Sequence, residues 1–144
     1  MPAFRFRLEK VLDWYQRQYE LEERRLAVCL AALAGAQNAM AVLQAERLAV
    51  ERDVVSRASI PSRDFVALGL YRLGAKKREL ELDAELARCR SAAEEQRGRL
   101  RAADRRVRLL QKLRERRVAE HVYAETRELE ELASDAFFAK WAAR

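Results

Sequence analysis

The sequence predicts an all-α protein: a long antiparallel two-helix coiled coil (an α-hairpin) whose second helix is longer and overhangs at the C-terminus. The 144 residues include only four Gly and two Pro, and 36% of them are charged, which is typical of long helices. Apolar residues recur at alternating spacings of three and four, as in a heptad repeat. This pattern stops at one internal site, which is the predicted turn.

The first helix is predicted over residues of about 3–57. Its apolar seam continues for six to seven heptads and is interrupted only by Glu22 and Arg47. Polar residues on such a seam set the register of the two helices at some cost in stability. The seam consists of Leu8, Leu12, Tyr15, Tyr19, Leu26, Cys29, Leu33, Ala36, Met40, Leu43, Val50 and Val54.

The turn is predicted at about residues 58–61, within the stretch SRASIPS, where Ser and Pro cluster. Proline is tolerated in the first turn of a helix but not in its interior, so the second helix is expected to begin near Ser62. Asp64 would then lie favourably at the positive end of this helix. The helix is predicted to continue to about residue 141, and residues 1–144 are expected to form a single coiled-coil domain.

The second helix has a seam of its own, followed by a change of phase. Val107 and Val118 are separated by an 11-residue step, which indicates a stutter, so we expect the helices to straighten or diverge near Leu110. If the hairpin tip lies near residue 59, two residues that face each other across the helices have numbers that sum to about 118. The first helix therefore has no residues left to face roughly the last 25 residues of the second helix. The seam consists of Leu68, Leu82, Leu86, Cys89, Ala93, Leu100, Ala103, Val107 and Leu110.

The predicted overhang carries an apolar stripe. Leu129, Ala133, Phe137 and Trp141 follow one another at steps of four, and Phe138 lies beside them. Residues four apart share one face of a helix, so the stripe is suited to a partner. The alternatives are that it frays in solution or folds back on the helix pair.

The charges form two blocks. Residues 97–117 contain ten Arg or Lys and two acids, whereas residues 118–135 contain six acids and one base. Nucleic acid is the weaker interpretation, because the acidic block would repel phosphates and no aromatic residue in the basic block could stack on bases. Alternating blocks favour docking on a protein surface with charge blocks of its own. The basic stripe consists of Arg97, Arg101, Arg105, Arg108, Lys112 and Arg116.

The sequence contains no residue pattern typical of a catalytic, redox, metal-binding or membrane-spanning site. Cys29 and Cys89 lie in the seams, which favours reduced core residues over a redox or metal role, and His121 has no second ligand at metal spacing. We therefore expect no enzyme activity, no cofactor and no metal. No segment approaches the roughly 20 uninterrupted apolar residues of a membrane span, and the N-terminus lacks the apolar core of a signal peptide, so a cytoplasmic protein is expected.

Three stretches carry a family resemblance. FRFRLEKVL at Phe4–Leu12 resembles the opening of the flagellar type III export protein FliJ, and QKLRERRVAEHVYAETRELEELASDAF at residues 111–137 is similar to the ending of that family. The tip SIPSRDFVALGLYRL at residues 59–73 is also similar. The resemblance covers nearly the whole chain. Phe137, Phe138 and Trp141 depart from the family pattern.

The resemblance implies a non-enzymatic stalk, similar to the central stalk of rotary ATPases. It would bind a hexameric export ATPase (FliI-like), promote ring formation, and contact the cytoplasmic domain of the export gate (FlhA-like) and escort chaperones, at the inner membrane of the flagellar base. Gate contact is expected nearer the hairpin, around Leu43, Tyr71 and Lys76. The expected ATPase end consists of Phe4, Leu8, Leu12, Leu110, Leu113, Arg114, Arg117, Tyr123, Leu129 and Leu132, with Phe137 and Trp141 of the overhang.

Three alternatives remain open. The stalk protein of virulence type III secretion is similarly coiled and basic, although the FRFRLEKVL opening favours the flagellar branch. A basic coiled-coil nucleic-acid binder belongs to a different class of function. In a homo-oligomeric scaffold, the C-terminal stripe would pair with a second copy.

Overall fold

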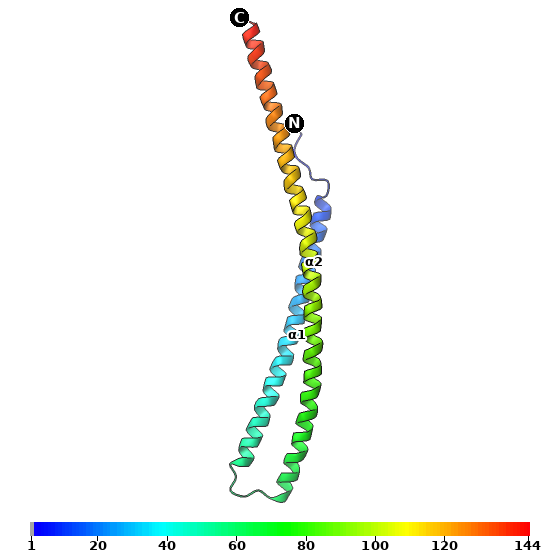
Figure 1. The fold of residues 1–144 in the computed structure, drawn as a ribbon, viewed down its shortest axis with the longest axis vertical. Helices are drawn as coiled ribbons and strands as arrows, with labels where there is room; N and C mark the ends of the chain where they lie inside the picture. Colours follow the sequence, from blue (N-terminus) through cyan, green and yellow to red (C-terminus); the bar gives the residue numbers. More distant parts are fainter. Residues whose placement is uncertain (1) are drawn as a thin grey trace. The chain divides into compact units, whose positions relative to one another are not determined.

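The protein is an antiparallel α-hairpin, as predicted. A computed structural model describes residues 2–144 and contains, within that range, two helices and no strand: α1 spans Glu9–Val55 and α2 spans Ser62–Ala142 (Figure 1). The helices pack against each other, and α2, with 81 residues, is longer than α1, with 47. The end of α1 and both ends of α2 lie within two residues of the predicted positions.

The start of α1 was predicted too early. Residues 2–6 are not helical, and Arg7 and Leu8 form a turn before Glu9. The stretch Phe4–Arg7 alternates apolar and basic residues, so an extended chain places both Phe side chains on one side, where they are half-buried, while both Arg side chains are exposed. Two Arg residues would also oppose the positive end of a helix, whereas Glu9 favours it.

The contacts group the chain into two compact units, where the sequence predicts one domain. Unit 1 contains residues 1–20 and 101–144, and unit 2 contains residues 21–100. Each unit combines a part of α1 with a part of α2. In a long helix pair, each residue contacts only residues at a similar height along the helix axes. Segments that lie far apart along the axes share no contacts, so they fall into separate units.

The core of unit 2 lies between the two seams. Leu82 is the most buried large side chain, with 1% of its surface exposed. It belongs to a cluster with Ala36, Met40 and Leu86. The partly buried residues packed against this cluster are Leu33, Ala39, Leu43 and Cys89. Both predicted seams are thus confirmed in this unit, and neither cysteine forms a disulfide.

The polar interruptions of the first seam each bind α2. The guanidinium of Arg47 donates to the carboxylate of Glu79 at 2.6 Å, and the Gln96 amide donates to both the carbonyl and the carboxylate of Glu22. Gln96 is only 6% exposed. These bonds support the predicted register-setting role of both polar positions, because any axial slip of one helix would leave a half-buried charge or amide unpaired.

The register differs somewhat from the predicted one. The facing pairs Glu22–Gln96, Glu51–Arg72 and Arg47–Glu79 have residue numbers that add up to 118, 123 and 126, against the predicted value of about 118. In unit 1, Arg114 still pairs with Glu9 at 3.0 Å, so the helices have not diverged at Leu110. The packed side chains, and not the midpoint of the turn, decide the axial offset of the two helices.

The turn is held by one arginine. The guanidinium of Arg57 contacts Asp53 at 2.9 Å and Asp64 at 3.1 Å, which joins the last turn of α1 to the first turn of α2. The Pro61 carbonyl accepts hydrogen bonds from the amides of Asp64 and Phe65, and α2 starts at Ser62 as predicted.

One part of α1 contradicts the prediction that no segment approaches a membrane span. Over 18 residues, α1 is apolar and poor enough in charge to cross a membrane by length and composition, yet only 6% of that window is buried. The sequence explains this result: between Leu26 and Ala45 there is no Asp, Glu, Lys or Arg. Small Ala residues supply much of the apolar character.

Candidate partner-binding surfaces

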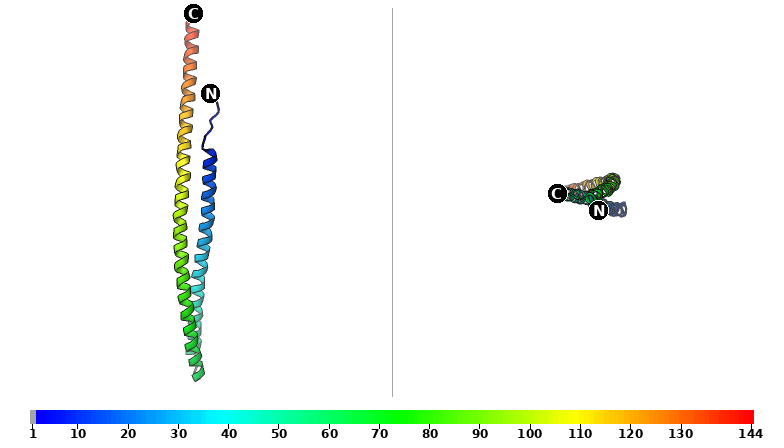
Figure 2. Two further views of the ribbon diagram at one scale, coloured as in Figure 1. Left: turned by 90° about the vertical axis from the view of Figure 1, so that its right-hand side faces the viewer. Right: turned by 90° about the horizontal axis from the view of Figure 1, so that it is seen from below.

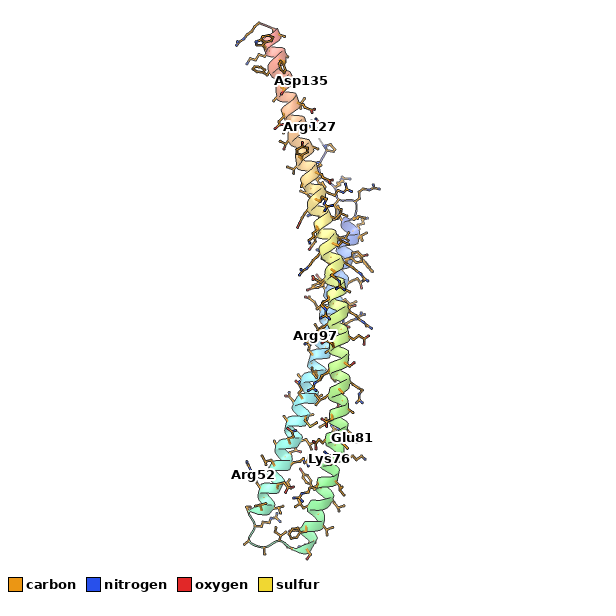
Figure 3. All side chains as sticks on the ribbon, in the orientation of Figure 1. Arg52, Lys76, Glu81, Arg97, Arg127 and Asp135 are labelled. Atoms are coloured by element: carbon orange, nitrogen blue, oxygen red, sulfur yellow. The ribbon has the colours of Figure 1, made fainter. Side chains whose placement is uncertain are left out.

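The C-terminal stripe is exposed on a part of α2 that has no helix beside it. Every residue from Glu125 to Arg144 is exposed, and Figure 3 shows side chains projecting from this segment on all sides, with Arg127 and Asp135 labelled. Leu129, Leu132, Phe137 and Trp141 expose between 59% and 71% of their surfaces. The rings of Phe137 and Phe138 meet edge to face, with centroids 5.9 Å apart. The overhang neither folds back nor buries its stripe in the described chain.

An N-terminal arm, residues 2–8, lies against α2 in unit 1 (Figure 2). The His121 Nε2–H donates to the Pro2 carbonyl at 3.0 Å, because a carbonyl oxygen can only accept. The Phe4 ring packs edge to face on the imidazole, with centroids 5.6 Å apart. His121 therefore anchors the arm, a role that the sequence analysis missed. The alternation of Phe and Arg at residues 4–7 was the signal that could have revealed it.

The predicted ATPase end divides into packed and exposed residues. Leu12 is 4% exposed and belongs to the hairpin interior, where a partner cannot reach it. Phe4, Leu110 and Leu113 are half-buried, and Leu8 is at the border of exposure. Arg114 pairs with Glu9, and Arg117 pairs with Glu120 at 3.2 Å. Tyr123 is 70% exposed.

A shallow open groove follows α2 just before the overhang. Two of its apolar members, Val122 and Tyr123, are 52% and 70% exposed. The groove is lined by Arg114, Glu115, Val118, Ala119, Val122, Tyr123 and Thr126. The groove lies on α2 between the packed part of the hairpin and the exposed C-terminal stripe. Of these seven residues, only Arg114 and Tyr123 were among the predicted site residues.

The basic stripe is exposed along α2. Arg97 pairs with Glu94 at 3.2 Å and Arg108 with Asp104 at 2.9 Å, both within the same helix. Within residues 2–144, the other four members, Arg101, Arg105, Lys112 and Arg116, have no ion-pair partner. Their charges remain available to an acidic partner.

The predicted gate-contact residues all lie in unit 2. Leu43 packs against the core cluster, Tyr71 is half-buried, and Lys76 is exposed with its Nζ 3.7 Å from Glu79 (Figure 3). Close by, the Nε–H and Nη2–H groups of Arg72 donate to the two carboxylate oxygens of Glu51, each at 2.6 Å. Hydrogen bonding from Arg72 holds the pKa of Glu51 below its usual range. Desolvation opposes this shift, and the positive charges of Arg72 and Arg47 add to it.

Neither a metal-binding cluster nor a comparison with known proteins assigns a function to these surfaces. Within residues 2–144, no three His, Cys, Asp or Glu side chains lie together as ligands of a metal ion would. No protein-family model, no curated protein and no solved structure matches the chain.

Proposed function

We propose that this protein is a non-enzymatic stalk of the bacterial flagellar type III export apparatus, which binds a hexameric FliI-like export ATPase, promotes its ring assembly and activity, and links it to a FlhA-like export gate and escort chaperones. The single observation that supports this proposal best is the overhang of α2. An antiparallel hairpin that continues as one helix with an exposed aromatic stripe offers an end that can enter a central opening.

The chemistry of this end suits a ring of subunits. The stripe supplies apolar contact area, with Trp141 and Phe137 more than 60% exposed. The neighbouring basic and acidic blocks of α2 supply axial register, because a charge block pairs with a complementary block only at one depth of insertion. One asymmetric helix meets the subunits of a ring in non-equivalent ways, which is what a stimulating axle requires.

The direct test measures ATP turnover. The purified chain is added to the export ATPase of the same bacterium, and the rate is compared with that of the ATPase alone. We expect stimulation by the intact chain and none after removal of residues 129–144. The truncation leaves the packed hairpin intact, because every removed residue is exposed. Full stimulation by the truncated chain would remove the overhang from the mechanism.

A matched pair of point variants sharpens this test. Trp141→Ala removes an aromatic side chain from the stripe, whereas Phe65→Ala removes one, 58% exposed, from the first turn of α2 near the hairpin tip. Both variants should fold. We expect Trp141→Ala to weaken stimulation roughly tenfold in half-maximal concentration, as for an interface hot spot. Phe65→Ala should act like the unmodified chain.

The unpaired arginines of the basic stripe favour a second candidate, a polyanion binder. Binding of phosphates through four or more basic side chains would weaken by orders of magnitude between about 50 and 200 mM salt, with little dependence on nucleotide sequence. The stalk proposal expects no such binding to duplex DNA or RNA at physiological salt. A nanomolar, strongly salt-dependent complex with either polymer, together with no effect on the ATPase, would favour the second candidate.

A further inference from the structure

We propose that a lateral face of α1 is a self-complementary interface, and that two copies of this chain pair through it in antiparallel orientation about Gly35. Residues of this face follow one another at steps of four, three, four, four, three and four. They are Arg24, Val28, Ala31, Gly35, Ala39, Val42 and Glu46. We call this set the α1 palindrome. It lies wholly within unit 2 and does not depend on the proposed function.

The order of side-chain sizes in the α1 palindrome is the same from either end. A two-fold axis at Gly35 places Val28 of one copy beside Val42 of the other, and Ala31 beside Ala39. A two-fold interface uses the same patch on both subunits, so a patch has to be complementary to itself in reverse. Side-chain size that increases symmetrically from Gly35 outward meets that condition.

The charges at the two ends identify a second copy as the occupant. The same axis places Arg24 of one copy beside Glu46 of the other, so each dimer contains this pair twice. Both residues are exposed, and neither has an ion-pair partner within residues 2–144. A parallel arrangement would instead place like charges together, which disfavours it.

Ala39 is half-buried against the core cluster of its own hairpin, whereas the other six residues of the α1 palindrome are exposed. Val28 and Val42 are 71% and 56% exposed, although both lie in the stretch from Leu26 to Ala45 that has no charged residue. A Cβ atom added to Gly35 would meet nothing within 4 Å, so nothing in its own hairpin requires glycine there. Glycine in the middle of a helix is unfavourable relative to alanine. Close approach of a second backbone would explain its presence.

A lipid bilayer fits the same apolar window less well. The facing part of α2 exposes charged side chains, which include Lys77, Arg78, Asp83 and Arg88, and α1 is packed against this helix through Leu82 and Leu86. Inserting α1 would either separate the hairpin or carry these charges into hydrocarbon. Pairing two α1 faces laterally leaves the same charges in water.

Sedimentation equilibrium on the full chain tests the proposal. We expect a dimer with twice the 16.7 kDa mass of one chain. Gly35→Leu should raise the dimer dissociation constant about tenfold or more, because the added side chains collide at the axis. The same change should raise the melting temperature of the monomer, since leucine is the better helix former. Gly74→Leu, at an exposed glycine of α2 with equally open surroundings, is the matched control and should leave the dimer unchanged.

Charge reversal tests orientation. Arg24→Glu and Glu46→Arg should each weaken the dimer, because each brings like charges together, and the double variant should restore it. A monomeric unmodified chain would overturn the proposal, whether or not it floats with phosphatidylcholine vesicles. It would also be overturned by a dimer that tolerates Gly35→Leu, or by one that is lost only on removal of residues 129–144, since that result would assign the contact to the overhang.

Discussion

Two regions of α2 contain the same kinds of residue and differ in what lies beside them. Leu82 lies in unit 2 against α1 and is 1% exposed, whereas Leu132 lies in the overhang and is 59% exposed. Both lie in the interior of α2. Helix formation thus follows from local sequence in both regions, while burial requires a second helix at the same level. The comparison separates residues that hold the hairpin together from residues that are free to bind a partner.

Truncating the two leucines should give the largest contrast. Leu82→Ala removes a fully buried side chain from the core cluster and should lower the free energy of unfolding by about 2–5 kcal/mol. Leu132→Ala removes an exposed side chain and should change it by about 0.5 kcal/mol or less. Urea denaturation followed by circular dichroism measures both values. Equal losses would mean that the overhang is packed in solution.

Cross-helix polar contacts should rank next. Gln96→Ala leaves the half-buried Glu22 without its amide donor and should cost about 1–3 kcal/mol, the penalty of an unsatisfied polar group. Gln111→Ala, at an exposed position of the same helix, is a control with the same change in chemistry. The same denaturation series compares the two. A cost below that of the control would show that Gln96 does not set the register.

An ion pair within the overhang should contribute less. Arg127 contacts Glu131 at 3.2 Å, four residues along one helix, and both side chains are 67% exposed. Arg127→Ala should therefore lower stability by only about 0.3–0.5 kcal/mol. Adding 0.5 M salt to the unmodified chain should remove most of that contribution. The measurement is local helicity, from hydrogen exchange of the amides of residues 125–135.

The smallest effect concerns pH near the hairpin tip. The hydrogen bond from Arg72 holds the pKa of Glu51 below its usual range in the folded state. The stability from this contact is therefore fully present above the pKa of the unfolded state, and it is lost as pH falls through the lower, folded-state pKa. Glu51→Gln should flatten this part of the acid titration of stability. An unchanged acid slope would assign the loss to other carboxylates.

The N-terminal arm shows why some of the site could not be predicted. The first helix was predicted from about residue 3, whereas α1 begins at Glu9. In the structure, Phe4 contacts His121, a residue 117 positions away, and this contact competes with a further helical turn. Sequence periodicity reports local preference, whereas the anchoring imidazole is a non-local partner. The α1 palindrome lies on a lateral face outside the seam, so the heptad pattern does not single it out.

The sequence by itself determined that the chain forms two helices, where the turn lies, which residues form the seams and that α2 exceeds α1 in length. These features follow from short-range properties, namely helical periodicity and the proline at residue 61. Only the tertiary structure decided the axial register, the arm on His121 and the exposure of Val28 and Val42. Each of these depends on which side chains meet across two helices, and that choice is made by packing between residues far apart in the chain.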